Sequence, residues 1–335
     1  MWIALDGMGG DNAPGVVVEG AVAAVKELDC NIFLIGQEDV LVNELSKHSY
    51  NKDKIKIERA TEVVNMDDSP IVSIRGKKDS SISVAVNLVK EKRAKAVVSA
   101  GNTGATVCAT SFNLGLLKGI ERPGISIIFP TSDGGNALMI DGGANIDPKP
   151  IHLLQYGFMA DAYCRFILGK KKPRVGLLSI GEEETKGTGF IKGAHKLLDE
   201  TNLNFIGNVE GRDIFTGSCD VILCDGFVGN VVLKVSESLA GAVGTLLKRE
   251  LSRNLLTTVG SLLCRSTFDA LKKELDYEEH GGAPLLGVNG TTIICHGSSS
   301  ARAIKNAVKV AIKYIKQDVN NHIIEGLEEY SSKEG

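Results

Sequence analysis

Six glycine-containing turns carry most of the side chains in this sequence that could perform chemistry, and each turn follows a short apolar run. They are DGMGGD (6–11), GNTGA (101–105), DGGAN (141–145), GEEETKG (181–187), DGFVGN (225–230) and HGSSS (296–300). Glycine lets backbone N–H groups approach an anion, and helix N-termini carry partial positive charge. Any single turn is better explained as ordinary strand-to-helix punctuation. Six turns with polar tips predict a composite site for a phosphate-like group.

Two side chains in these turns are candidates for catalysis. Lys186 follows three glutamates just past a strand, where its ammonium could stabilise charge on phosphate or on a developing oxyanion. Asn230 ends its turn and could donate a hydrogen bond that aligns a substrate. A surface lysine paired with a glutamate, and a helix cap, are the competing interpretations.

The remaining polar and glycine positions of the turns form two groups. The group expected to bind phosphate or substrate is Asn102, Thr103, Gly104, Asp225, Gly226, His296, Gly297, Ser298 and Ser299. The group expected to shape its own loops is Asp6, Gly9, Gly10, Asp141 and Asn145. Capping of a helix is the alternative for Asn102 and Thr103, and Ser300 is the expected cap after the last turn.

The sequence lacks the motifs of several common kinds of active site. The sequence has no Walker A, HExxH or GxSxG pattern, and its six histidines show no paired ligand spacing. We therefore expect no metal and no cofactor. Cys224 could be a covalent nucleophile, but it ends an apolar strand with no evident cationic neighbour, and we do not favour that role.

Composition limits the class of protein. The 335 residues are 43% hydrophobic with a net charge of −3, which argues against a dedicated nucleic-acid binder. Seven scattered cysteines without a CxxC pair indicate a reducing compartment. The first residues do not resemble a signal peptide, and no apolar run approaches the roughly 20 residues of a membrane-spanning helix. The expectation is a protein that is soluble or attached to a membrane surface.

Strands and helices alternate along the chain, which predicts a doubly wound, mostly parallel α/β fold. The carboxyl ends of its strands would then meet at one edge and form the site. Residues 125–129 and 137–140 predict a hairpin that adds an antiparallel strand. Residues 61–80 predict a loop or flap, residues 231–280 a long helical region, and residues 301–328 a closing helix. We expect one large unit over residues 1–335, with a candidate division into 1–170 and 171–335.

The segment 251–273 has an apolar stripe on one helical face. From this segment alone, a buried dimer contact is favoured, and an interfacial helix touching anionic lipid is the alternative. The stripe consists of Leu255, Leu256, Val259, Leu262 and Leu263, and it is flanked by Lys248, Arg249, Arg253 and Arg265.

Taken in order, the segments DGMGGD, SAGNTGA, IERPGIS, DGGANIDPKP, GEEETKG, NFIGNVEGRD, DGFVGN, GGAPLLGVNG and HGSSS resemble the PlsX family of acyl-ACP:phosphate acyltransferases. The resemblance extends over nearly the whole chain, to residue 310. Trp2 stands where a basic residue is common, Gly7 where alanine is common, and Thr188 where asparagine is expected. The last departure affects the contacts beside Lys186.

The resemblance implies transfer of a fatty acyl group from acyl carrier protein to inorganic phosphate, an early step of bacterial phospholipid synthesis. It also implies a fold related to phosphate acetyltransferases and isocitrate dehydrogenase, a homodimer, and a cytoplasmic protein peripherally associated with the inner face of the cell membrane. That changes the favoured interpretation of residues 251–273 to a projecting tip. Its leucines and valine would contact lipid, and its basic residues would dock the acidic carrier protein.

The residues agree with this chemistry. Dianionic phosphate can attack a thioester without a protein base, and the departing thiol has a pKa of about 8.5. Positioning and oxyanion stabilisation are then the enzyme's tasks. The alternatives are a phosphate acetyltransferase-like enzyme that uses acyl-CoA, and a non-catalytic scaffold at a membrane surface.

Overall fold

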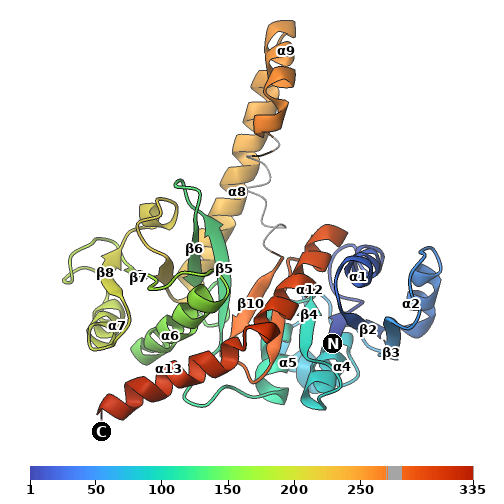
Figure 1. Cartoon of the computed structure of the whole chain (residues 1–335), viewed down its shortest axis with the longest axis horizontal. Coiled ribbons are helices and arrows are strands. Elements are labelled where there is room, and N and C mark those ends of the chain that lie inside the picture. The colour runs from blue at the N-terminus through green and yellow to red at the C-terminus, as the bar shows by residue number, and fades with distance from the viewer. Residues whose placement is uncertain (269, 271–280, 335) are drawn as a thin grey trace.

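The computed structural model describes residues 1–268, 270 and 281–334 of the chain. Within these residues, eleven strands form one sheet in the order β3-β2-β1-β4-β11-β10-β5-β6-β9-β7-β8 (Figure 1). The strands are β1 (Trp2–Asp6), β2 (Asn31–Gly36), β3 (Ile55–Arg59), β4 (Ala96–Ser99), β5 (Gly124–Pro130), β6 (Asn136–Ile140), β7 (Val175–Leu178), β8 (Phe205–Val209), β9 (Val221–Leu223), β10 (Ala283–Leu286) and β11 (Thr291–Ile294).

Three antiparallel pairings divide the sheet into two parts of opposite direction. β10 is antiparallel to β11 and to β5, and β5 is antiparallel to β6, while all other neighbours are parallel. The α/β class and the β5–β6 hairpin are confirmed. The prediction that all carboxyl ends meet at one edge is wrong, because β6, β9, β7 and β8 run opposite to β1–β4 and β11. The direction reverses between β5 and β6, whereas β10, which the sequence analysis did not anticipate, is inserted between β11 and β5, which run the same way.

Helices cover both faces of this sheet. Side chains alternate across a strand, so Ile3 and Leu5 pack with α1 and α12 while Ala4 packs with α4 and α5 on the other face. The helices are α1 (Gly15–Glu27), α2 (Glu38–Leu45), α3 (Pro70–Gly76), α4 (Ser81–Lys90), α5 (Thr103–Asn113), α6 (Pro150–Phe166), α7 (Gly189–Asp199), α8 (Gly226–Leu251), α9 (Leu255–Leu263), α12 (Ala301–Lys316) and α13 (Val319–Glu334), with a 3-10 turn at Gly211–Ile214.

Three helical predictions need correction. The predicted loop 61–80 contains α3. The predicted closing helix is two helices, α12 and α13, because Asp318 adopts a left-handed φ of 49° between them. The long helical region breaks after α8 and resumes as α9, whose start is capped by Asn254. The part of that region at 271–280 lies outside the described residues.

The hydrophobic core joins segments that are distant in sequence. One cluster combines Tyr156 and Leu177 with Ile323, and another combines Leu5 and Ile32 with Ile304. Both clusters therefore draw on residues from each side of position 170. Packing does not follow the candidate division into 1–170 and 171–335.

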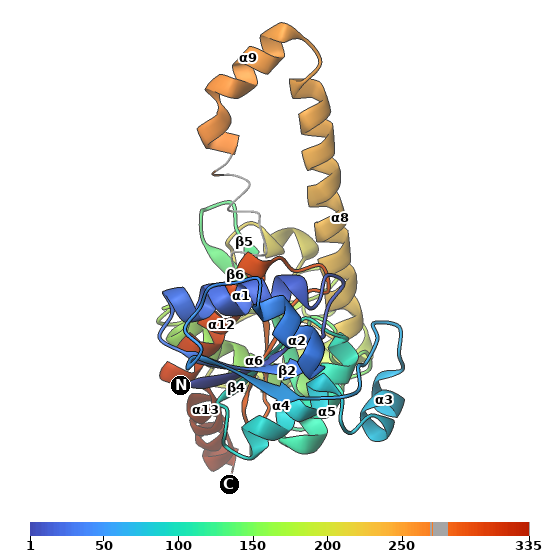
Figure 2. The same ribbon diagram turned by 90° about the vertical axis from the view of Figure 1, so that its right-hand side faces the viewer.

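Helix α8 leaves the body of the protein after its first turns. At 1.5 Å per residue its 26 residues extend about 39 Å, and α9 turns back at its far end (Figures 1 and 2). By length and composition alone, α8 is the one helix in the described part of the chain that could cross a membrane, contrary to the sequence expectation. The N-terminal turns of α8 pack on the sheet through Val232 and Leu233.

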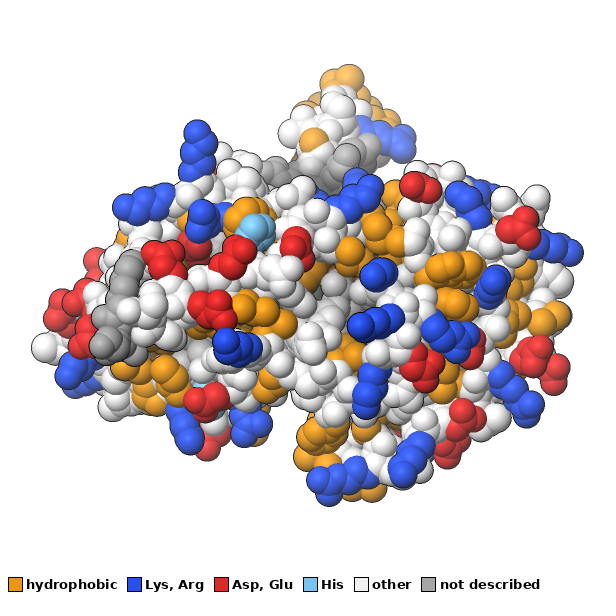
Figure 3. Space-filling view, turned by 60° about the horizontal axis from the view of Figure 1, so that its bottom comes forward, with side chains coloured by type: hydrophobic (Ala, Val, Ile, Leu, Met, Phe, Trp, Pro, Cys, Tyr) orange, Lys and Arg blue, Asp and Glu red, His pale blue; other side chains and the backbone are white. Residues whose placement is uncertain are grey.

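The body has a mixed surface charge on the face shown in Figure 3, where acidic and basic side chains are interspersed. No extended basic stripe crosses that face of the described residues. This arrangement is in keeping with the small net charge.

Candidate active site

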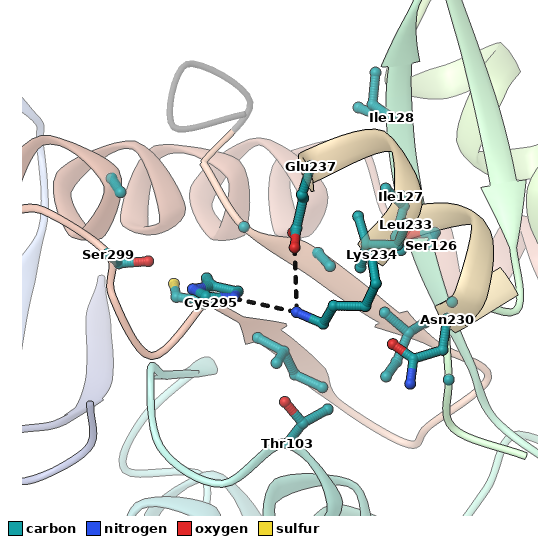
Figure 4. Close-up of a pocket in the computed structure, with 18 of the residues that line it drawn as sticks. Thr103, Ser126, Ile127, Ile128, Asn230, Leu233, Lys234, Glu237, Cys295 and Ser299 are labelled. Atoms are coloured by element: carbon teal, nitrogen blue, oxygen red, sulfur yellow. Dashed lines mark hydrogen bonds and ion pairs between the residues drawn. The ribbon is translucent and has the colours of Figure 1, made fainter. Parts of the chain in front are cut away.

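A cleft of about 400 Å³ lies across β5 and β10, where the sheet changes direction (Figure 4). The β4 and β11 turns reach it from one edge of the sheet, and the β6 and β9 turns reach it from the other. Because the strand direction reverses, turns that leave the sheet at opposite edges reach the same cleft. If all carboxyl ends lay at one edge, these turns would meet at that edge instead. Its lining is Thr103, Gly104, Ile125, Ser126, Ile127, Ile128, Gly142, Gly143, Asn230, Leu233, Lys234, Glu237, Gly282, Ala283, Ile294, Cys295, His296, Ser299 and Ala303.

The β4 turn presents the start of α5 to the cleft through Thr103 and Gly104. Asn102 precedes them as the cap of α5, because its Oδ1 accepts the Ala105 N–H at 2.9 Å. Its Nδ2 donates to backbone carbonyls of residues 65, 66 and 68. These four bonds engage the Asn102 amide in capping α5 and anchoring the 61–69 loop. A role for Asn102 in phosphate binding stays a prediction.

The β1 turn supports the cleft from behind. A side chain at Gly9 would come within 2.6 Å of the Gly101 nitrogen, so only glycine fits this approach. The Asp11 N–H donates to the Gly297 carbonyl at 2.8 Å, which ties this turn to the β11 turn. Asp6 is buried and accepts from the Met8 N–H and the Ser99 hydroxyl. Burial raises the pKa of this carboxyl.

The β11 turn contributes His296 and Ser299 to the lining, whereas Gly297 and Ser298 lie outside it. His296 Nδ1 accepts the Ser298 N–H at 3.2 Å, which fixes the ring near the end of the strand. Ser300 caps α12 by accepting the Ala303 N–H. The expected cap is confirmed.

The β6 turn is organised by the buried carboxylate of Asp141. Its Oδ1 accepts the N–H groups of Ile125, Gly143 and Ala144, and its Oδ2 accepts that of Asn145. Burial raises the pKa of Asp141, although these N–H groups act to lower it. The carboxylate is engaged by backbone, as expected for a loop-shaping residue, and Gly142 and Gly143 line the cleft beside it.

The β9 turn starts α8 and places Asn230 in the cleft. Asp225 caps α8 by accepting the Val228 N–H at 2.9 Å, and the Gly226 N–H donates to the Asn145 carbonyl. Gly229 packs so tightly that an added Cβ would overlap the Asp141 carbonyl oxygen. Asp225 and Gly226 therefore hold α8 against the β6 turn, and Asn230 is the member of this turn that lines the cleft.

Lys234 and Glu237 are cleft residues that the sequence analysis missed. Lys234 extends between the Asn230 and Ser299 sides, and its Nζ lies 3.2 Å from Glu237 Oε2 (Figure 4). The same Nζ lies 3.4 Å from His296 Nε2. The available signal was their spacing on α8, four and seven residues after Asn230, which places all three on one helical face.

Lys186 is not among the residues that line this cleft. Its side chain is exposed at the turn after β7, where its N–H donates to the Glu183 carbonyl. The strand directions put this turn at the same edge as the β6 and β9 turns. Its proposed contact with phosphate or an oxyanion stays a prediction.

Cys224 is buried beside the Asp141 carbonyl, to which its thiol donates at 3.6 Å. Burial raises its pKa well above the ordinary value, and the nearby Asp141 and Asp225 raise it further. The group is a thiol at neutral pH, which disfavours a nucleophilic role. Within the described residues, no three His, Cys, Asp or Glu side chains gather as metal ligands would.

The predicted lipid-contact residues lie on α9, at the far end of the projection. Leu255 and Leu263 are 85% and 82% exposed, and the other three members of the stripe are also exposed. The predicted docking residues Lys248, Arg249 and Arg253 are nearby at the end of α8. Arg249 and Arg253 both pair with Glu250, and Arg265 follows α9.

Comparison with known proteins adds a family and a fold. A sequence model of the family described as fatty acid synthesis protein matches residues 1–322. The chain is 52% identical over 329 residues to the phosphate acyltransferase of Geotalea uraniireducens, covering 98% of this chain and 95% of that protein. It is 51% identical, with the same coverage, to the phosphate acyltransferase of Geotalea daltonii.

Among solved structures, the chain resembles a phosphotransacetylase from Streptococcus pyogenes, with a TM-score of 0.65 and 94% of each chain covered. Sequence identity to that protein is 18%, so the likeness concerns the fold alone. It confirms the predicted kinship of fold with phosphate acetyltransferases.

Proposed function

The chain belongs to the fatty acid synthesis protein family, PlsX, and from that membership we propose that it transfers a long-chain fatty acyl group from acyl carrier protein to inorganic phosphate. The observation that carries this proposal is the two-sided character of the cleft. One side is an apolar wall of Ile125, Ile127 and Leu233, suited to an acyl chain. The other side presents the start of α5 at Thr103 and Gly104, suited to an anion.

The reaction needs little from the protein beyond this arrangement. A phosphate oxygen attacks the thioester carbonyl carbon, and the carbonyl oxygen becomes an oxyanion. As that intermediate collapses, the carbon–sulfur bond breaks and the electron pair leaves with the carrier sulfur as a thiolate, which then takes up a proton. The products are acyl phosphate and free carrier protein. The side-chain amide of Asn230 can donate to the thioester oxygen and align it without changing its own charge.

Lys186 is proposed to add positive charge when both substrates are bound. Its turn must then move closer to the cleft, because its side chain is exposed outside the cleft lining. Purified Lys186→Ala tests this role. We expect a large fall in kcat with the fold intact, and near-normal turnover of acyl-ACP would refute the role.

The direct test of the proposed function is incubation of the purified protein with long-chain acyl-ACP and phosphate, followed by detection of acyl phosphate. Asn230→Ala should lower kcat by about 100-fold, as expected for loss of an oxyanion donor. The exposed Asn202→Ala is the matched control, with wild-type turnover expected. Product from acetyl-CoA but not from acyl-ACP would favour the acyl-CoA alternative. No product from either donor would favour a non-catalytic scaffold.

The projecting helix is proposed to serve a homodimer and a membrane surface. Val231, Val235, Leu239 and Val243 are exposed at intervals of four residues along α8, and they form an apolar stripe that the other described residues leave open. We propose that a second copy covers this stripe and that the α9 leucines contact the inner face of the cell membrane. Light scattering of Val235→Glu/Leu239→Glu should report a monomer, whereas an unchanged mass would place the dimer contact elsewhere.

The basic residues at the end of α8 and after α9 are proposed to steer the acidic carrier protein. Arg253 is 77% exposed on its side chain, which suits a long-range electrostatic role. Charge reversal at Arg253 and Arg265 should raise the KM for acyl-ACP while leaving the KM for phosphate unchanged. An unaltered KM for acyl-ACP would contradict docking at this site.

A further inference from the structure

Lys234 is placed to meet an anion inside the cleft. It projects from the third turn of α8, between Asn230 and the end of β11 (Figure 4). Among the described residues that line the cleft, Lys234 is the one lysine, and none is an arginine. Lys234 therefore lines the cleft together with the start of α5 and the apolar wall.

Glu237 holds this ammonium in the structure. The Lys234 Nζ lies 3.2 Å from Glu237 Oε2, and the two side chains are three residues apart on α8. Such a pair on a solvated helix surface contributes little to stability. Because the pair lies in the cleft, an anionic ligand bound there can compete with Glu237 for the Lys234 ammonium. A dianionic ligand attracts the ammonium more strongly than a single carboxylate does.

We propose that Lys234 is the cation that binds the phosphate substrate. In the absence of phosphate, Glu237 is the counterion of this ammonium, and phosphate displaces it. This inference rests on the proposed function, whose phosphate substrate it uses. The ammonium would move by rotation about its side-chain bonds toward the N–H groups at Thr103 and Gly104. Glu237 would remain at the rim, and its negative charge would weaken phosphate binding.

This role differs from the one proposed for Lys186. Lys234 acts on phosphate before chemistry, so its loss should appear in the KM for phosphate. Lys186 acts on charge that develops during acyl transfer, so its loss should appear in kcat. The two lysines can therefore be separated by the kinetic parameter that each one changes.

The test combines a calorimetric titration with inorganic phosphate and steady-state kinetics with acyl-ACP. Lys234→Met should weaken phosphate binding and raise the KM for phosphate by about tenfold, while the KM for acyl-ACP stays unchanged. Loss of a charge-assisted hydrogen bond corresponds to about 10- to 100-fold. We take the lower value because the Lys234 side chain is 56% exposed and solvent screens it.

Three further variants sharpen the result. Lys234→Arg keeps the charge and should remain within about threefold of the wild type. Glu237→Gln removes the competing charge and should tighten phosphate binding by about twofold to fivefold. Lys309→Ala, at an exposed position on α12, is the control and should match the wild type.

Phosphate affinity of Lys234→Met within twofold of the wild type would overturn the inference, as would weaker binding in Glu237→Gln. An equal rise in the KM for acyl-ACP would also count against it, because that would indicate general damage to the cleft. Failure of the wild type to form acyl phosphate would instead refute the proposed function. The calorimetric titration reads phosphate binding independently of turnover.

Discussion

Helix α8 runs through two regions, the body and the projection, which differ in whether apolar side chains are buried or exposed. In the body, β9 and the start of α8 pack into a core where Ile222 and Met139 are fully buried. On the projection, the same helix exposes Val235 and Leu239, and α9 exposes Leu255. Burial of apolar surface contributes roughly 25 cal/mol per Å², so the body is stabilised by its own packing. The projection gains little within one chain, and its apolar residues require a surface outside it.

The first prediction compares one substitution at two positions of α8. Gly229→Ala should destabilise the protein by about 3 kcal/mol, because the added methyl overlaps the backbone oxygen of Asp141. Gly241→Ala on the projection meets nothing within 4 Å and should stabilise the helix by about 0.5–1 kcal/mol. Denaturant unfolding of both variants measures the difference. Equal effects would show that the two parts of α8 are packed alike.

The second prediction addresses the tip. Leu255→Ser/Leu263→Ser should lower binding to anionic lipid vesicles by at least about 100-fold, since each leucine contributes about 1.5–3 kcal/mol on transfer from water. Stability should stay within about 0.5 kcal/mol of the wild type, because both side chains are exposed. Vesicle sedimentation and a thermal melt separate these readouts. A lower melting temperature with unchanged vesicle binding would assign the leucines to packing.

The third prediction compares ion pairs in the two regions. Burial alone would raise the pKa of Asp220, but hydrogen bonds from Arg174 and the charge of Lys170 outweigh it and lower the pKa from 3.8 to about 2. The ionised Asp220 therefore stabilises the folded state above pH 3.8, and this contribution is lost as the pH falls toward 2. Asp220→Asn should cost about 2 kcal/mol at pH 7 and almost nothing near pH 2.

Glu250 on the projection is the control for that experiment. Its side chain is 54% exposed in its pairs with Arg249 and Arg253. Glu250→Gln should change the free energy of unfolding by less than about 0.5 kcal/mol at either pH. A larger loss than that of Asp220→Asn would contradict the distinction between the regions.

In the body of the protein, sequence patterns predicted the individual strands and helices better than they predicted the order and direction of the strands in the sheet. The α/β alternation and the β5–β6 hairpin follow from local apolar runs, which the structure confirms. β10 was missed because it has four residues, contains Pro284, and lies between glycines that are typical of turns. Its strand conformation depends on pairing with β5 and β11, which is tertiary information. The reversal itself lies in the predicted β5–β6 hairpin, but the pairing of β6 with β9, which carries the new direction into the rest of the sheet, is also tertiary information.

The candidate site was predicted in part for the same reason. Glycine turns identified Thr103, Asn230 and His296, which the structure brings to one cleft. Lys234 was missed because a lysine on a helix usually belongs to a solvated face, and only the fold shows that this face lines a cleft. The exposed α9 stripe was recognised, but an amphipathic pattern does not say whether protein or lipid covers it.

The central claim is that one cleft at the reversal of the sheet accommodates inorganic phosphate beside the acyl thioester. The most direct measurement is a crystal structure with phosphate and a non-hydrolysable acyl-thioester analogue. The account predicts phosphate within hydrogen-bond distance of the N–H groups at the start of α5, with the acyl chain along Ile125 and Ile127. Phosphate bound outside this cleft, with the acyl chain absent from the β5 wall, would contradict it.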